Sequence, residues 1–198
     1  NQIFVMFNYF FFDFFMVYEL LMKLTHVPVK KITLRKLNLT KDISNKYLKW
    51  MNDLEVHKYT EQKYTKHSLI NIRKFVKEKN KSKNEFLYGI FLKRNNLNIH
   101  IGNIKLGPIN FIHKTGEISY FIGEKELWGK GYTTLAIKEI IKIAKKMGLK
   151  KLKAGLYEMN IGSKKVLEKN NFKLEGKMKS EIIHKGKRYN SYWFGKIL

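Results

Sequence analysis

The sequence predicts an α/β protein, with one domain in which a mixed sheet carries helices on its faces. Short segments rich in β-branched and aromatic residues alternate with longer segments whose apolar residues recur at helical spacing. From residue 23 onward there is no Pro/Gly/Ser-rich linker and no internal repeat. A chain of 198 residues is long enough for one well-cored domain and short for two.

The first half of this domain is expected to contain a strand, two helices and then three strands. The strand is predicted over residues 31–35 and the first helix over residues 42–52. Ser68 is a candidate N-cap of the second helix, whose apolar residues at helical spacing are Leu69, Ile72, Phe75 and Val76. The three strands that follow are expected at residues 86–93, 99–106 and 117–122.

The second half is expected to contain a helix, a strand, a short helix and a hairpin. Residues 132–147 give the clearest helical pattern, with Gly148 at the C-terminal cap and a buried stripe formed by Ile137, Ile140, Ile141 and Ala144. The strand is predicted over residues 151–157 and the short helix over residues 163–170. The hairpin pairs residues 181–184 with residues 189–194.

Residues 1–22 differ in composition from the rest of the chain, because they hold seven of the 14 phenylalanines and no Lys or Arg. Their apolar run has the length of a membrane span, but Asp13 lies at its centre, where a carboxylate costs about 2.5–3.5 kcal/mol. A signal peptide is not expected, since both the basic segment and the small-residue cleavage site are missing. We expect either a non-native extension, with Met22 as the natural start, or a weak membrane anchor or surface helix. Membrane contact is expected only if residues 1–22 are native, and residues 1–21 are expected to be dispensable.

The net charge of +24 suggests nucleic-acid binding, which is the alternative function of a different class. Only four of the 40 basic residues are arginine, and the lysines are spread along the chain. Because groove-reading proteins depend on arginine forks, we expect no specific nucleic-acid partner. The chain has no cysteine, which excludes a disulfide framework, a thiolate zinc site and a cysteine nucleophile. This composition fits a reducing compartment, so a cytoplasmic location is expected.

Residues 117–134 contain the pattern that carries chemistry: a strand, a loop with Gly129 and Gly131, and then a helix. Glycines at these positions allow a tight turn and leave backbone amides uncovered at the positive end of the helix dipole. Such a turn is an anion site. A P-loop is excluded because five residues, instead of four, separate Gly123 from Gly129. A Rossmann fingerprint is excluded because Thr133 and its neighbour Thr134 stand where a third glycine is needed.

The segment Trp128-Gly-Lys-Gly-Tyr-Thr133 resembles the acetyl-CoA loop of the GNAT superfamily of N-acetyltransferases. The likeness is to the branch that contains ribosomal-protein alanine acetyltransferases and amino-sugar acetyltransferases. A second motif, Asn160-Ile-Gly-Ser163, follows the next strand, as in that family. The resemblance covers roughly residue 32 to the end. It implies a GNAT-like fold, with a mostly antiparallel sheet splayed at the cofactor site and helices on both faces.

The resemblance also implies the residues of the site, with acetyl-CoA as co-substrate and no metal. Cofactor binding falls on the strand end, the loop and the second motif, namely Phe121, Ile122, Trp128, Gly129, Lys130, Gly131, Tyr132, Thr133 and Asn160. The expected catalytic residues are Glu117 and Ser163. No metal-ligand spacing is seen among the six histidines.

Each catalytic assignment has a plainer alternative. Glu117 resembles the family's base, which acts through water, but a solvent-facing carboxylate at a strand end would look the same. Leu167 stands where many members carry a proton-donating tyrosine, so Ser163, one helical turn earlier, is the expected donor. Its alternative is an ordinary serine at a helix N-terminus. Tyr120 and Tyr157 are further candidates for the base, although packing explains them equally well.

The resemblance implies that a primary amine attacks the thioester directly. The partner is therefore a small-molecule or peptide amine, and an amino sugar of a surface-polysaccharide pathway is the expected acceptor. Acetylation of a protein N-terminus, as in the ribosomal-protein alanine type, is the alternative. A homodimer is an open alternative to a monomer.

Overall fold

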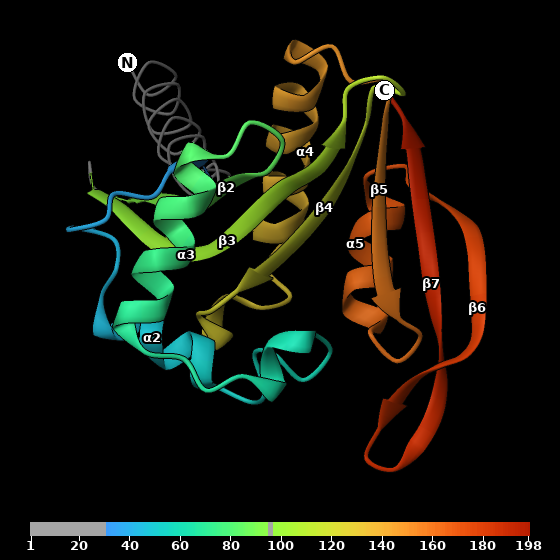
Figure 1. The fold of residues 1–198 in the computed structure, drawn as a ribbon, viewed down its shortest axis with the longest axis horizontal. Coiled ribbons are helices and arrows are strands. Elements are labelled where there is room, and N and C mark those ends of the chain that lie inside the picture. Colours follow the sequence, from blue (N-terminus) through green and yellow to red (C-terminus); the bar gives the residue numbers. More distant parts are fainter. Residues whose placement is uncertain (1–30, 95–96) are drawn as a thin grey trace, which may run out of the picture. The chain divides into compact units, whose positions relative to one another are not determined.

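A computed structural model describes residues 31–94 and 97–198. One sheet has its seven strands in the order β1-β2-β3-β4-β5-β7-β6 (Figure 1). The strands are β1 Ile32–Lys36, β2 Phe86–Arg94, β3 Leu97–Asn110, β4 Thr115–Ile122, β5 Lys151–Tyr157, β6 Lys173–His184 and β7 Lys187–Ile197. Neighbouring strands are antiparallel except for β4 and β5, which run parallel. The predicted fold class, a mixed and mostly antiparallel sheet, is confirmed.

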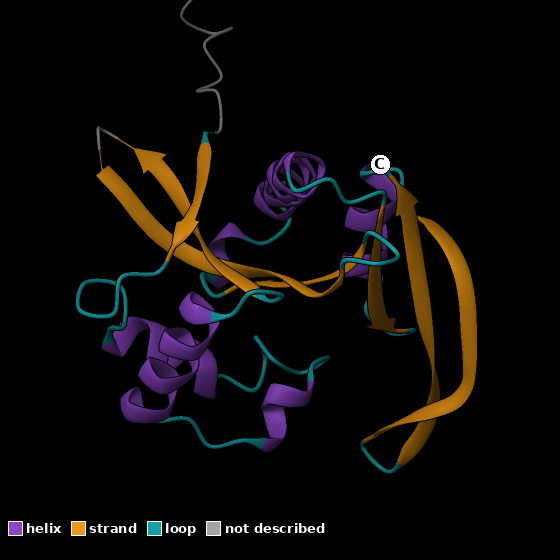
Figure 2. Cartoon of the chain, turned by 45° about the horizontal axis from the view of Figure 1, so that its top comes forward, coloured by secondary structure: helices purple, strands orange, loops and turns teal. Residues whose placement is uncertain are grey.

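Helices cover both faces of this sheet (Figure 2). They are α2 Asn45–Asn52, α3 Leu69–Lys81, α4 Tyr132–Lys146 and α5 Ile161–Lys169, with short 3-10 turns η1 Glu61–Tyr64 and η2 Lys125–Leu127. The helices α4 and α5 share one apolar cluster with the central strands, whereas α2 and α3 share a second cluster with β2. The sheet therefore separates two cores, and both contribute to the site described below.

Local sequence explains where α3 and α4 begin and end. Ser68 and Asn71 form a capping box at the start of α3, as each side chain accepts a hydrogen bond from the other residue's backbone N–H. The predicted stripe of α4 is confirmed for Ile137, Ile140 and Ala144, which are fully buried, whereas Ile141 is only partly buried. Gly148, just after the C-cap of α4, adopts a φ of +77°, which L-residues rarely reach.

Two helices begin elsewhere than predicted. The helix α2 begins at Asn45 instead of residue 42, because Ser44 caps it and accepts a hydrogen bond from the Tyr47 backbone N–H. The helix α5 begins at Ile161 instead of residue 163, because the Asn160 side chain is the cap. In both cases a capping side chain near the predicted start determines where the helix begins.

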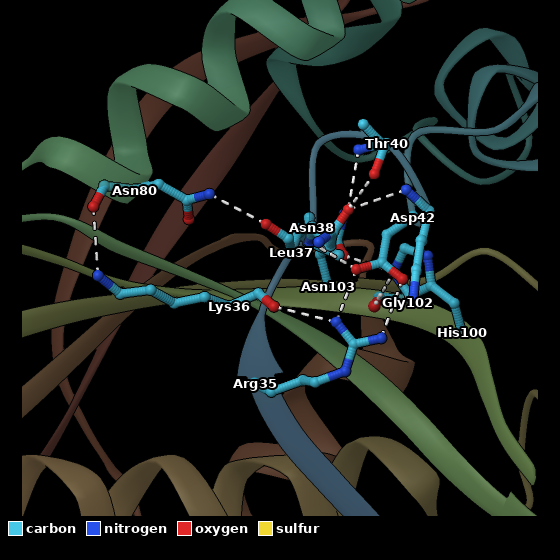
Figure 3. Close-up of polar contacts among 11 residues, drawn as sticks. Arg35, Lys36, Leu37, Asn38, Thr40, Asp42, Asn80, His100, Gly102 and Asn103 are labelled. Atoms are coloured by element: carbon cyan, nitrogen blue, oxygen red, sulfur yellow. Dashed lines mark hydrogen bonds and ion pairs between the residues drawn. The ribbon is translucent and has the colours of Figure 1, made fainter.

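Asp42, expected inside α2, lies instead in the turn between β1 and α2. Its carboxylate accepts two hydrogen bonds from Arg35, at 2.6 and 2.9 Å, and one from the Asn38 backbone N–H at 2.6 Å (Figure 3). Burial alone would raise the pKa of Asp42, but these hydrogen bonds outweigh burial and hold that pKa below its ordinary value. The ionised carboxylate thus links Arg35 of the edge strand β1 to the turn that leads into α2.

We expect Asp42→Asn to lower the free energy of unfolding by about 2 kcal/mol at pH 7, since charge-assisted hydrogen bonds are lost. A carboxylate with a lowered pKa stabilises the fold fully above its unfolded pKa, and this contribution disappears as the pH falls through the folded pKa. The difference between wild type and variant should therefore shrink between pH 5 and pH 3 in urea unfolding experiments. A difference that stays constant over this range would contradict the assignment. Glu139→Gln, at an exposed pair on α4, is the control and should change stability by less than about 0.5 kcal/mol.

The β6–β7 hairpin is longer than predicted, and its turn consists of Lys185 and Gly186 alone. Both have positive φ values, of 49° and 74°, which is the signature of a type I′ turn. Asn171, which follows α5, also has a positive φ of 61°. Asparagine tolerates this conformation, as the sequence predicts for this position.

The N-terminal extension predicted over residues 1–22 lies outside the described residues. The boundary between this extension and a domain from residue 23 therefore stays a prediction. Within residues 31–94 and 97–198, no helix is both long and apolar enough to cross a membrane.

Candidate active site

The loop between β4 and α4 has the geometry of an anion site. Gly129 and Gly131 adopt φ values of +72° and +84°, and a Cβ on either would meet no atom within 4 Å. Both glycines are exposed, so the backbone is open to a ligand. Gly131 is the N-cap of α4 and provides no capping side chain. The positive end of the longest described helix therefore lacks a side-chain cap, as a site for a pyrophosphate requires.

Side-chain contacts fix this loop in place. The Trp128 ring donates a hydrogen bond of 2.8 Å from Nε1 to the Ile122 carbonyl at the end of β4. Lys125 forms ion pairs with Asp53 at 2.9 Å and Glu55 at 3.1 Å, in the segment after α2. These ion pairs lie on the surface, so they add little to stability but hold the loop beside α2.

Next to this loop, the sheet splays. The parallel strands β4 and β5 pair only over residues 115–117 and 151–153, and their ends diverge beyond that point (Figure 1). Phe121 and Ile122, predicted to bind the cofactor, lie at the end of β4 that pairs with β3 but no longer with β5. Thr133 lies in the first turn of α4, beside Tyr132. Asn160 caps α5 across the splay, and its Oδ1 accepts the Ser163 backbone N–H at 3.1 Å.

Ser163, the predicted proton donor, faces a partner from the opposite side of the splay. Its Oγ lies 2.7 Å from the Tyr120 hydroxyl on β4, across 43 residues of sequence. Burial raises the pKa of Tyr120 to about 12, so this phenol stays protonated at neutral pH. Ser163 is not the helix cap, because Asn160 has that role. Leu167 is fully buried in the core, so a tyrosine at this position would overpack it.

Glu117, the predicted base, is the last residue of β4 that pairs with β5. Its Oε1 forms an ion pair with Lys153 Nζ at 3.4 Å. Glu117 is not among the residues that line the cavity described next. Its role as a base acting through water therefore stays a prediction.

A cavity of about 480 Å³ lies between the sheet and the α2–α3 layer. We call it the α2–α3 cavity. Its apolar and aromatic lining residues include Tyr47, Met51, Ile72, Phe75, Leu87 and Phe121. Its polar lining residues include His57, Thr60, Glu61, Gln62, His67, Asn71, Asn103 and Ser119. Tyr120 also borders it, but the Tyr120 ring packs against the cluster of α4 and α5 on the other face of the sheet, where its hydroxyl meets Ser163.

Three buried nitrogen atoms of the α2–α3 cavity have no hydrogen-bond partner among the described residues: His57 Nε2, His67 Nε2 and Asn103 Nδ2. Leaving such atoms unpaired is costly, so their clustering in one cavity marks a place where water or a polar ligand binds. Glu61 is the only carboxylate among the described residues that line it.

On the side of the cavity toward β5, residues of the segment after α2 contact β5 and the β6–β7 hairpin. The Tyr157 hydroxyl, at the end of β5, donates a hydrogen bond to Glu61 Oε1. The Tyr59 ring packs edge-on against Tyr157, at 6.5 Å between centroids. Lys63 lies 3.5 Å from His184 Nδ1 on β6. Burial, together with the nearby Glu61 carboxylate, raises the pKa of Tyr157, so its hydroxyl remains a donor.

The sequence pattern did not single out His57, Glu61 or Asn103 as site residues. Glu61 and His57 lie in the irregular segment after α2, where neither helical nor strand periodicity applies. Asn103 is an inward-facing polar residue in an otherwise apolar stretch of β3. This pattern was the one sequence signal that could have marked it as a site residue. Among the described residues, no group of three or more His, Cys, Asp or Glu side chains could hold a metal ion.

Comparison with known protein families identifies the family of this chain. The family model of the acetyltransferase (GNAT) domain matches residues 31–173. The chain belongs to the GNAT family. It is an acetyl-CoA-dependent N-acetyltransferase, and the resemblance stated from the two motifs is confirmed. No protein in the curated set matches the chain.

Solved structures share the fold of this GNAT enzyme. A RimL ribosomal L7/L12 alpha-N-protein acetyltransferase in complex with coenzyme A is 20% identical, with a TM-score of 0.74 over 87% of this chain and 96% of that chain. The spermidine N-acetyltransferase from Vibrio cholerae, with CoA and spermine, is 19% identical, with a TM-score of 0.73 over 84% and 95%. The microcin C7 self-immunity acetyltransferase MccE, with acetyl-CoA and AMP, is 21% identical, with a TM-score of 0.72 over 85% and 93%.

The residues of this GNAT enzyme fit acetyl-CoA. The turn at Gly129 and Gly131 has no Cβ to block the approach of a pyrophosphate, and the N-terminus of α4 favours its negative charge. The splay between β4 and β5 leaves backbone groups on both strand ends without sheet partners, as an extended pantetheine arm requires. Bound there, acetyl-CoA supplies the activated acetyl group.

Proposed function

We propose that this GNAT enzyme transfers the acetyl group to the primary amine of an amino sugar in a surface-polysaccharide pathway. The observation that carries the proposal is the composition of the α2–α3 cavity. Aromatic walls such as Phe75 and Phe121 suit the apolar faces of a sugar ring, and the unpaired polar atoms suit its hydroxyl groups. A volume of about 480 Å³ is of the right order for one such ligand.

The charges around the cavity favour a single amine over a polyamine. A bound polyamine buries several ammonium groups, and each would need a paired carboxylate. Glu61 alone serves this purpose among the described lining residues. Lys79 and Lys105 also line the cavity and share the single Glu85 carboxylate, so these three side chains together carry one excess positive charge. Such a region favours an acidic group, for example the diphosphate of a nucleotide-linked sugar.

The alternative acceptor is a protein N-terminus, which is what the name of the RimL neighbour states for that protein. An α-amine with a pKa of about 8 is roughly one-tenth neutral at pH 7, so it needs only a weak base. A peptide would extend beyond a cavity of about 480 Å³, whereas a single sugar ring would fit within it. The amino sugar is therefore the acceptor we put first.

Within this proposal, the residue roles follow from their positions. Gly129 and Gly131 hold the pyrophosphate, Ser163 donates a proton to the leaving thiolate, and Glu117 accepts the amine proton through water. We also propose that the enzyme is cytoplasmic, and it could act either as a monomer or as a homodimer.

A panel assay tests the proposal. Purified enzyme and acetyl-CoA are mixed with UDP-amino sugars, peptides with free N-termini, and spermidine, and both thiol release and product mass are measured. We expect the highest kcat/KM for an amino sugar. A preference for peptides would establish the alternative, and a preference for spermidine would contradict both acceptor proposals.

A further inference from the structure

His57 has the most unusual environment of the side chains that line the α2–α3 cavity. It is only 2% exposed, and its ring packs edge-on against Phe121, with 5.0 Å between ring centroids. Phe121 is on the end of β4 that has diverged from β5, so His57 lies beside the splay. Its Nδ1 is 3.2 Å from Thr60 Oγ1, whereas Nε2 has no hydrogen-bond partner among the described residues.

We assign the ring hydrogen of His57 to Nδ1 from the contacts of Thr60, whose hydroxyl oxygen lies 3.2 Å from both Nδ1 and the His57 backbone carbonyl oxygen. The Thr60 hydroxyl donates its only hydrogen to the His57 backbone carbonyl, at 3.2 Å. Thr60 Oγ1 can then only accept a hydrogen bond from His57 Nδ1, so Nδ1 carries the ring hydrogen. Nε2 is consequently left with a lone pair that is buried in the wall of the cavity.

The ring is also neutral at physiological pH. Burial lowers the pKa of His57 to about 4, and the neighbouring His67 adds to this effect, while Asp53 opposes it. A group with this pKa is too weak a base to take a proton from an ammonium group whose pKa is about 8. Proton abstraction is therefore excluded for His57 at pH 7, whereas accepting a hydrogen bond is favoured.

Asn103 provides a donor that is also next to Phe121. It is the cross-strand partner of Phe121, so both side chains lie on the same face of the sheet. The His100 ring donates from Nε2 to the Gly102 carbonyl at 3.0 Å and to Asn103 Oδ1 at 2.8 Å (Figure 3). Because the amide oxygen faces His100, Asn103 Nδ2 is the end directed toward the Tyr47 hydroxyl, with which it makes no hydrogen bond of normal geometry. An acceptor and a donor thus both neighbour one aromatic ring.

We infer that His57 Nε2 accepts a hydrogen bond from a hydroxyl group of the acceptor substrate, and that His57 with Asn103 selects hydroxylated amines over aliphatic ones. A hydroxyl group both donates and accepts, which matches the unpaired lone pair on His57 and the unpaired N–H on Asn103. A site built to bond a hydroxyl discriminates strongly against analogues that lack it, because its buried polar atoms are then left unpaired. This inference rests on the proposed amino-sugar function.

Two substitutions at His57 separate recognition from structure. The amide of His57→Asn can reproduce Nδ1 and its contact with Thr60, but it does not reach the position of Nε2. His57→Gln reaches that position and can present an oxygen acceptor there. With an amino sugar we expect His57→Asn to lower kcat/KM about 30-fold, mainly through KM, and His57→Gln to recover part of the loss. The KM for acetyl-CoA should be unchanged in both variants.

A deoxy analogue of the same amino sugar provides the decisive comparison. Wild type and His57→Asn should acetylate it at similar rates, because the hydroxyl that His57 reads is absent. Asn103→Asp, which replaces the donor by an acceptor and keeps the oxygen that faces His100, should show the same loss of selectivity and serves if the His57 variants do not fold. Equal losses on both acceptors, or no loss on either, would overturn the inference while the amino-sugar function stands. A wild-type enzyme that prefers amines without hydroxyl groups would overturn both.

Discussion

Gly131→Asp is expected to abolish acetyl-CoA binding and, with it, acetyl transfer. Gly131 is the N-cap of α4, and a Cβ atom added there meets no atom within 4 Å. The substitution therefore creates no clash, but it places a carboxylate at the helix end where the pyrophosphate is proposed to bind. In a thermal-shift experiment, acetyl-CoA at a hundredfold excess over Kd should stabilise the wild type by about 2.7 kcal/mol. The variant should show no shift.

Gly148→Asp is the matched control for this experiment. Gly148 follows the other end of α4, and its φ of +77° is close to the +84° of Gly131. Both positions have open space around them, so aspartate meets the same backbone strain at each. Gly148→Asp should lower the Tm in a similar way but keep the acetyl-CoA shift. If both variants lose the shift, strain in α4 explains the loss, and if both keep it, the pyrophosphate is held elsewhere.

Local patterns in the sequence predicted the parts of the site that depend on neighbouring residues. The stripe of Ile137, Ile140 and Ala144 predicted α4, and Gly129 and Gly131 predicted the turn before it. In these segments the conformation follows from helical spacing and from the need for positive φ, both of which a single sequence displays. The two motifs at successive strand-to-helix junctions were therefore sufficient to indicate the family.

The acceptor side of the site could not be predicted in the same way, because it is assembled from distant segments. Tyr157 contacts Glu61 across 96 residues of sequence, and Tyr120 contacts Ser163 across 43 residues. Such contacts follow from the order of strands in the sheet and have no periodicity. His57 lies in a segment without regular structure, so no pattern marked its burial. The start of α5 was also predicted too late, because the capping role of Asn160 was not recognised. Since Asn160 is the cap, the Ser163 hydroxyl is available to contact Tyr120.

Ser163→Ala is expected to lower kcat by roughly tenfold to a hundredfold, with little change in the KM for acetyl-CoA. The substitution leaves the helix cap intact, because Asn160 Oδ1 bonds the backbone N–H of residue 163 and not its side chain. The loss is modest for a general acid, since the N-terminal dipole of α5 continues to favour a thiolate. Ser119→Ala, which removes a hydroxyl from the lining of the α2–α3 cavity, is the control and should retain nearly full kcat.

Tyr120 extends this prediction, because its hydroxyl can donate a hydrogen bond to Ser163 Oγ while the serine hydroxyl faces the thiolate. Its hydroxyl lies 2.7 Å from Ser163 Oγ, and with a pKa of about 12 it holds its own proton at neutral pH. Tyr120→Phe should therefore lower kcat about threefold to tenfold. If the two hydroxyls act as one unit, the double variant will be no slower than Ser163→Ala alone, since effects within a unit do not add. Steady-state kinetics on the four proteins measures this coupling. Additive losses would show that Tyr120 acts apart from Ser163, and full activity in Ser163→Ala would mean that water protonates the thiolate.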